Sequence, residues 1–336
     1  MKPLSILVSV LAMAAAPIAL GNDTAAVLRT GGLEFVTNEQ IHMESEALFI
    51  SASEIRVVYR FVNESEADQN VLVAFPMPDI ASDWWMPSAL PLGPADNPFE
   101  FETLFNGEPA EAELHQYAYA LGVDRTQYLI DHDVPLLSSD PAVLDAIAAL
   151  DAGTQAEMEH LGLIAPDPYA VDDGTQTYYV PAWIWRASYT WEAEFPAGEA
   201  VTVEHRYTPS VGGTAGVSFF TEPYDGYDPA AEYAVKYCTD KAFLNAVRQA
   251  GPAGEPWQAP FTEQWISYIL TTGGNWAGGT IDNFRLTVDK GEADNLVSFC
   301  GEDVTKTGPT TFEMVKTDYW PDRDIDILIL DRYEPQ

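Results

Sequence analysis

Basic residues are scarce in this 336-residue chain, in which 16 lysines and arginines stand against 52 aspartates and glutamates and the formal net charge is −36. A surface this negative repels phosphate backbones and anionic lipid headgroups at long range. The sequence therefore predicts no nucleic-acid partner. Divalent cations and basic proteins stay open as partners, although such acidity more often serves solubility, for example in a saline habitat where screening weakens self-repulsion.

Long apolar runs are absent except at the N-terminus. A run from Leu4 to Leu20 follows a single cation, Lys2, and ends in Ala19-Leu20-Gly21, a small-residue pattern that is typical of a secretory signal peptide. The alternative is a membrane anchor, but the run is short for a span of about 20 residues. We expect residues 1–21 to be a signal peptide cleaved after Gly21. The remaining chain then has a net charge of 15 − 52 = −37, no transmembrane segment and a periplasmic or secreted location.

Cysteine occurs twice, at Cys238 and Cys300. An exported protein meets an oxidising compartment, and two cysteines allow a single pairing, so we predict a Cys238–Cys300 disulfide. The closed loop spans 300 − 238 = 62 positions, for which chain entropy suggests a stabilisation of about 4 kcal/mol. The alternatives are two buried thiols that pack as small apolar groups and a metal site, for which two thiolates are an incomplete ligand set.

Catalytic motifs are also missing. The chain has no Gly-x-Ser-x-Gly elbow and no Ser-x-x-Lys motif, and its glycine-rich stretch at 212–216 lacks the following Lys and Ser/Thr of a phosphate loop. Among 52 acidic residues the sequence singles out no pair for glycosidase chemistry. We therefore assign no catalytic residue and predict no cofactor.

Histidine is rare, with five residues in the chain and neither HExxH nor His-x-His spacing, so a zinc site would need distant segments. His132, between Asp131 and Asp133, and His205, in a predicted strand, are candidate ligand-binding residues. We interpret His132 as part of a polar loop and His205 as a structural hydrogen-bond partner. The segment Asp322 to Asp326 has the spacing of a calcium loop without its glycine and final carboxylate, so we predict no metal site.

Alternating apolar residues predict antiparallel β structure over most of the chain. Ile55 to Phe61 alternates, and together with the apolar run Val71 to Phe75 it predicts a hairpin. Asn106-Gly107 predicts a tight turn in a second hairpin. We therefore expect a mainly β fold with a helical insertion, in antiparallel β-sandwich-like layers.

Helical spacing begins at Leu114, Tyr117, Ala118 and Leu121, and further helices are predicted at Pro141 to Leu150, Ala156 to Leu161 and Lys241 to Arg248. The predicted organisation is a signal peptide at 1–21, an N-terminal β-sandwich-like region at 22–111, a helical insertion at 112–168, a β region at 169–216 that continues the N-terminal sheets, and a C-terminal β region at 217–336 with the disulfide.

Aromatic residues are the strongest indication of a ligand. Trp84 and Trp85 lie in a proline-rich loop, where exposed rings could stack on sugars or peptides, and they are further candidate ligand-binding residues. A second group shares one parity along a predicted strand, and this pattern favours a buried sheet face over a ligand surface. Its members are Tyr179, Trp183, Trp185, Tyr189 and Trp191.

Several short segments stand in this order along the chain: Asn22-Asp23-Thr24, Gly31-Gly32-Leu33, Ser45 to Ser51, Val73 to Asp79, Gly122 to Thr126, His205 to Gly212, Leu270 to Trp276 and Phe299-Cys300-Gly301. Taken together, they resemble a bacterial exported family known as domain of unknown function 4424. The resemblance implies a location in the bacterial cell envelope. It implies no particular activity, because the family has none assigned.

These observations favour an exported cell-envelope protein that acts by binding and not by catalysis, with an envelope protein or a glycan as its partner. One alternative is a carbohydrate-binding protein that uses exposed Trp and Tyr side chains. The other is a hydrolase whose acidic or histidine site is assembled from distant segments. Whether the chain catalyses any reaction stays open at this level.

Overall fold

Antiparallel strands dominate the computed structural model, which describes residues 22–29, 32–82, 93–171, 174–223, 226–252 and 255–334. The predicted signal peptide at 1–21 and the candidate residues Trp84 and Trp85 lie outside the described residues. The expectation of a mainly β fold with helices is confirmed.

A seven-stranded antiparallel sheet has the order β10-β9-β13-β5-β1-β2, with β6 beside β13. Its strands are β1 (Thr24–Arg29), β2 (Gly32–Val36), β5 (Gln69–Pro76), β6 (Ile80–Ala81), β9 (Glu113–Ala120), β10 (Val123–Asp124) and β13 (Ile184–Phe195). We call it the first sheet.

An eight-stranded second sheet has the order β19-β20-β17-β3-β4-β14-β7-β8. Its strands are β3 (Ile41–Ile50), β4 (Ile55–Asn63), β7 (Glu102–Phe105), β8 (Glu108–Pro109), β14 (Ala200–Tyr207), β17 (Ala277–Asp289), β19 (Thr305–Lys306) and β20 (Thr311–Tyr319). Strand β17 runs parallel to β3, so strands from the two ends of the chain share this sheet. The boundary predicted at residue 217 therefore does not separate two sheets.

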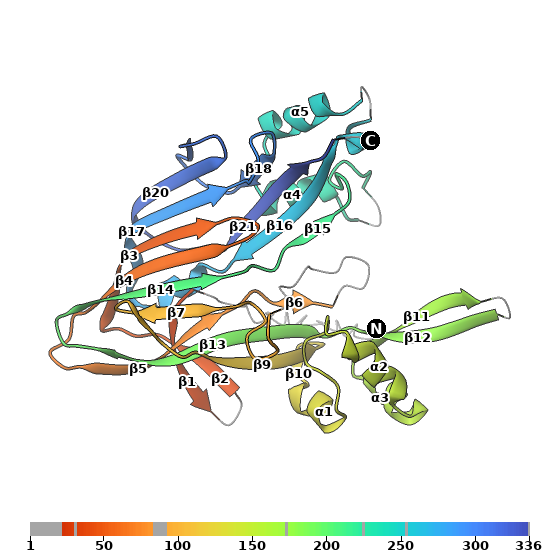
Figure 1. Cartoon of the computed structure of the whole chain (residues 1–336), viewed down its shortest axis with the longest axis horizontal. Helices are drawn as coiled ribbons and strands as arrows, with labels where there is room; N and C mark the ends of the chain where they lie inside the picture. The colour runs from red at the N-terminus through yellow and green to blue at the C-terminus, as the bar shows by residue number, and fades with distance from the viewer. Residues whose placement is uncertain are drawn as a thin grey trace, which may run out of the picture.

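A four-stranded third sheet has the order β15-β16-β21-β18, and a separate hairpin, β11-β12, extends away from all three sheets (Figure 1). The strands are β15 (Gly212–Thr214), β16 (Phe261–Tyr268), β18 (Leu296–Phe299), β21 (Ile325–Arg332), β11 (Ile164–Val171) and β12 (Gly174–Pro181). Helices α4 and α5 lie beside the third sheet, α1 lies near β9 and β10, and α2 and α3 lie at the base of the β11-β12 hairpin (Figure 1).

The helices are short and several begin at an aspartate that caps them. They are α1 (Thr126–Asp131), α2 (Ala142–Ala149), α3 (Ala152–His160), α4 (Pro229–Lys236) and α5 (Lys241–Ala250), with 3-10 turns η1 (Pro256–Gln258) and η2 (Thr271–Asn275). Asp228 accepts a hydrogen bond from the Ala231 N–H in the first turn of α4, and Asp240 accepts one from the Phe243 N–H in the first turn of α5; both N–H groups would otherwise lack partners. Within the described part of the chain, no helix has the length and apolar character to cross a membrane.

The main core lies between the sheets and joins residues from all three of them, including Phe75, Tyr59 and Ile327. Strand β21 is buried on both faces: Ile327 contacts the main core, and its neighbour Leu328 contacts a second core under α4 and α5. A strand covered on both sides needs a continuous apolar run, which explains the sequence Ile327 to Leu330. A third core lies under α1, α2 and α3.

The hairpin predicted from Ile55 to Phe75 is wrong. Strand β4 pairs with β3 and β14 in the second sheet, whereas β5 pairs with β1 and β13 in the first. The polar loop between them thus crosses from one layer to the other. The hairpin at Asn106-Gly107 is confirmed, because β7 pairs with β8 and both turn residues have positive φ.

The helix predicted from Leu114 to Leu121 is also wrong, because this segment forms β9 and pairs with β13 over seven residues. The side chains of β9 contact two different parts of the protein. Ala118 and Ala120 are buried in the core under the helices, whereas the Tyr117 hydroxyl accepts a hydrogen bond from the Leu33 N–H at 3.0 Å. The other predicted helices are confirmed, as α2, α3 and α5.

Candidate functional site

The disulfide between Cys238 and Cys300 is present, with a Cα–Cα distance of 5.0 Å. It joins the end of the α4 segment to the end of β18 and confirms the predicted pairing. The aromatic residues that share one parity in and before β13 belong to the protein core. Trp183, Trp185, Tyr189 and Trp191 are buried, and Tyr179 is half-buried. They are therefore not a ligand surface.

The candidate histidines occupy different environments. The His132 Nδ1 lies 2.8 Å from the carbonyl oxygen of Tyr128, and the two rings stack with centroids 4.4 Å apart. His132 thus completes the end of α1. His205 is buried between the sheets, with Nδ1 3.0 Å from the Thr103 hydroxyl and Nε2 3.0 Å from Asp23 Oδ1.

The carboxylates of the calcium-like segment have protein partners. Asp324 Oδ1 accepts hydrogen bonds from the Leu270 N–H at 3.0 Å and the Thr271 N–H at 3.2 Å, at the start of η2. Asp326 Oδ1 accepts one from the Ser267 hydroxyl at 2.6 Å. Over the described residues, no group of three or more His, Cys, Asp or Glu side chains is arranged to hold a metal ion.

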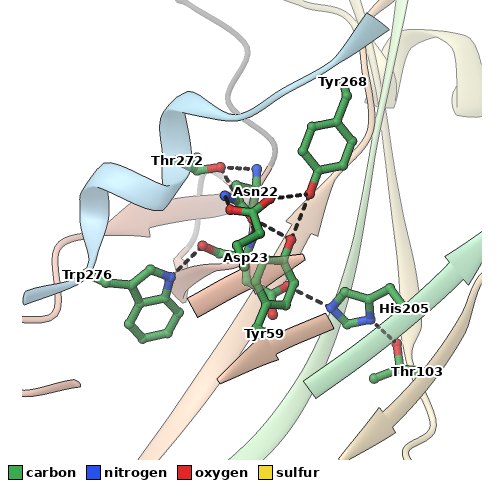
Figure 2. A network of polar contacts seen from close by, with 9 residues as sticks. Asn22, Asp23, Tyr59, Thr103, His205, Tyr268, Thr272 and Trp276 are labelled. Atoms are coloured by element: carbon green, nitrogen blue, oxygen red, sulfur yellow. Dashed lines mark hydrogen bonds and ion pairs between the residues drawn. The ribbon is translucent and has the colours of Figure 1, made fainter. Parts of the chain in front are cut away.

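His205 belongs to a buried polar network that surrounds the start of the described chain (Figure 2). We call it the N-terminal polar cluster; its members are Asn22, Asp23, Glu46, Tyr59, His205, Tyr268, Thr272 and Trp276. The residues come from β3, β4, β14, β16 and the η2 turn, so this network connects the second and third sheets. Sequence reasoning identified His205 alone among them.

The two carboxyl groups of this cluster, Asp23 and Glu46, are buried away from solvent. Burial raises the pKa of Glu46 to about 8, although hydrogen bonds from Asn22 and Tyr268 oppose the shift. Burial also raises the pKa of Asp23, and the nearby His205 opposes that shift through its charge and its hydrogen bond. Perturbed carboxyls often mark active sites. Here both side chains are essentially closed to solvent, so the cluster is not a site that a ligand reaches from outside.

A surface pocket of about 260 Å³ is lined by four aromatic side chains, of which Tyr227 is exposed and Trp265 is half-buried. We call it the aromatic pocket, and its lining residues are Ser218, Thr221, Tyr227, Pro229, Glu232, Tyr233, Lys236, Tyr237 and Trp265. Helix α4 provides one wall, because Tyr233 and Tyr237 are four residues apart and lie on one face of the helix and the segment after it. Trp265 of β16 provides another wall.

A buried carboxylate, Glu263, accepts hydrogen bonds from several residues that line this pocket. Its Oε2 accepts hydrogen bonds from the Tyr233 hydroxyl at 2.6 Å, the Ser218 hydroxyl at 3.1 Å and the Trp265 indole N–H at 3.2 Å. Its Oε1 accepts one from the Ser218 N–H at 2.6 Å. Burial raises the pKa of Glu263, and these hydrogen bonds oppose the shift. The carboxylate therefore fixes the orientation of three lining side chains before any ligand arrives.

A second hollow, of about 670 Å³, is polar and more open in character. Its lining includes Glu54, Arg206, Lys290 and Asp331, with Phe49 as its aromatic ring. Arg206 is already paired with Glu54 at 2.6 Å, and the Lys290 ammonium donates to the Ala293 carbonyl at 2.6 Å. Because Arg206 and Lys290 already have partners within the protein, this hollow is a weaker candidate than the aromatic pocket.

Sequence reasoning missed the aromatic pocket. A local signal for one wall is present in the sequence. Asp228-Pro229 predicts the start of a capped helix, and the spacing of Tyr233 and Tyr237 predicts an aromatic face on it. The approach of Trp265 to that face depends on the pairing of β16 with β21, which no local pattern reveals.

Comparison with known families finds a match over nearly the whole described chain. A family described as "Domain of unknown function (DUF4424)" matches residues 21–328. Among solved structures, the chain is similar to a "putative nutrient binding protein" from Legionella pneumophila subsp. pneumophila str. Philadelphia 1, with 15% identity and a TM-score of 0.44, over 93% of this chain and 71% of that one. A likeness at this level assigns no function. No curated protein matches the chain.

Proposed function

We propose a binding function for this chain, which belongs to the DUF4424 family: it is a non-catalytic binding module of the cell envelope whose ligand enters the aromatic pocket. The observation that carries the proposal is the combination of four aromatic side chains with a buried carboxylate that holds two of them in place. A site whose side chains are oriented in advance loses less conformational entropy on binding.

The lining favours a small neutral ligand with several hydroxyl groups, such as a saccharide. The faces of Tyr227 and Trp265 can cover its apolar C–H surfaces, and Glu232 and Lys236 can exchange hydrogen bonds with its hydroxyls. An anionic ligand is disfavoured by the net charge of −36.

The pocket favours binding over hydrolysis. A glycosidase needs two carboxyl groups that face the scissile bond. Glu263 does not meet this need, because both of its oxygens already accept hydrogen bonds from the pocket wall, and Glu232 lies at the pocket without a second carboxyl among the lining residues.

The proposal is tested by calorimetric titration of the chain from Asn22 onward with a panel of envelope glycans. For a glycan that binds, Trp265→Ala should weaken the affinity by about tenfold or more, because one stacked ring contributes roughly 1.4 kcal/mol. Trp257→Ala is the matched control, since that ring is 53% exposed and lies outside the pocket. Equal losses in both variants, or turnover of the glycan by the purified protein, would contradict the proposal.

The cell-envelope location rests on the apolar run at the N-terminus and is proposed together with the binding function. Fractionation of cells that express the full chain should recover the shortened protein outside the cytoplasm. Recovery of the full-length chain in the cytoplasm would contradict this part of the proposal.

A further inference from the structure

Every polar atom of Asn22 makes a hydrogen bond. Its backbone N–H donates to the Thr272 hydroxyl, which donates back to the Asn22 carbonyl at 2.7 Å. Its side-chain Nδ2 donates to Glu46 Oε2 at 2.9 Å, and its Oδ1 accepts from the Tyr59 hydroxyl and from the Asp23 N–H. Figure 2 shows these contacts converging on Asn22 from the η2 turn and from the strands behind it.

The η2 turn closes tightly over this residue. The Trp276 indole N–H donates to the Asp23 carbonyl at 2.6 Å, and Asn275 Nδ2 donates to the Thr24 hydroxyl at 3.0 Å. A Cβ at Gly273 would lie 2.8 Å from Asn22 Nδ2, which is closer than side chains tolerate. Asn22 is therefore enclosed by a socket, which we call the Asn22 socket, and is 0% exposed.

The charges inside this socket do not balance. The N-terminal polar cluster holds two buried carboxyl groups, Asp23 and Glu46, but a single imidazole, His205, and the described contacts bring no Lys or Arg to either carboxyl. Asp23 Oδ2 is buried and has no hydrogen-bond partner among the described residues. A buried carboxylate without sufficient donors or counter-charge costs several kcal/mol.

We propose that the chain is cut directly before Asn22 and that the new α-ammonium group of Asn22 remains buried in the socket as the counter-charge of Asp23 and Glu46. Hydrolysis of the Gly21–Asn22 peptide bond adds the hydroxyl of water to the Gly21 carbonyl and a hydrogen to the Asn22 nitrogen. The proton released by the new Gly21 carboxyl group is balanced by the proton that the new amine takes up at neutral pH.

Replacing the backbone N–H of Asn22 by an α-ammonium group supplies the hydrogen-bond donors and the positive charge that the N-terminal polar cluster lacks. A backbone N–H is one donor without charge, whereas an α-ammonium is three donors with one positive charge. One donor continues to serve Thr272, and two more become available to a network that contains the unpartnered Asp23 Oδ2. The added positive charge lies in the same cluster as the carboxyl groups of Asp23 and Glu46, to which the described contacts bring no Lys or Arg. Removal of the preceding segment is thus a step that completes the core, as well as a step of export.

The proposal is tested first by the position of the cut and by the accessibility of the amine. Mass spectrometry of the processed protein should show a chain that begins at Asn22. In the folded protein, the Asn22 α-amino group should resist acetylation by an amine-reactive ester, whereas the exposed Lys241 and Lys306 should react, and all should react after denaturation. A chain that begins elsewhere, or an α-amino group that reacts as fast as these lysines, would overturn the proposal.

The second test measures the counter-charge itself. A chain that begins at Gly21 places its ammonium one residue away from the socket, and we expect its unfolding equilibrium constant in urea to be about tenfold or more above that of the chain that begins at Asn22. Glu46→Gln should shrink this ratio, because one carboxylate has been removed, whereas Glu39→Gln, an exposed control, should leave it unchanged. Equal stability of the two chains, or the same ratio with and without Glu46, would overturn the proposal.

Discussion

Glu46 makes the stability of the chain depend on pH as long as a peptide bond precedes Asn22. Burial raises the pKa of this carboxyl from 4.5 to about 8 in the folded state, against the opposing hydrogen bonds from Asn22 and Tyr268. Between these two values the folded protein keeps a proton that the unfolded chain has lost. The contribution of Glu46 to the free energy of unfolding is therefore largest below about pH 4.5, and it falls as the pH rises toward 8.

The size of this effect follows from the shift. The two pKa values differ by 8 − 4.5 = 3.5 units, and each unit corresponds to about 1.4 kcal/mol, so the loss of stability across this range is on the order of 5 kcal/mol. Glu46→Gln keeps the shape of the side chain and removes its titration. All other titratable groups are the same in both proteins, so the difference between the two proteins isolates Glu46.

The assay is urea unfolding of the chain that begins at Gly21, with and without Glu46→Gln, at several pH values from about 5 to about 8. The free energy of unfolding of the unsubstituted chain should fall relative to that of the variant by up to about 1.4 kcal/mol per pH unit. The same comparison in the chain that begins at Asn22 should give a smaller difference, because a nearby ammonium favours the ionised carboxylate. Parallel pH profiles for the Gly21 chain and its variant would refute the reasoning.

Three further predictions concern stability and charge. Replacing Cys238 and Cys300 with serine should lower the free energy of unfolding by about 4 kcal/mol, because the disulfide, whose cysteines are 62 positions apart, no longer restricts the unfolded chain. An unchanged urea midpoint would contradict this prediction. Leu129→Ala should cost about 2–5 kcal/mol in the core under α1, whereas its neighbour Ile130, which is 50% exposed, should tolerate alanine within about 0.5 kcal/mol; similar losses would contradict the assignment. The chain should not bind duplex DNA at physiological salt, and a gel shift that weakens with added salt would show otherwise.

Local patterns in the sequence determined those helices and strands that bury one face and expose the other. Alternation of apolar residues identified β4, helical spacing identified α2 and α5, and Asn106-Gly107 identified the β7-β8 turn. The disulfide was determined by counting, since two cysteines allow one pairing. These features follow from interactions between residues that are close in sequence, or from arithmetic, and need no knowledge of the rest of the fold.

Tertiary structure alone decided which strands are neighbours and what lies between them. The spacing of Leu114 to Leu121 suited a helix, but pairing with β13 made it a strand, because the apolar side chains could be buried on two faces of a sheet. The aromatic pocket depends on Trp265 meeting α4, and the Asn22 socket joins residues 250 positions apart. Such contacts are set by the packing of whole layers, and a local pattern specifies that a side chain is buried without specifying its partner.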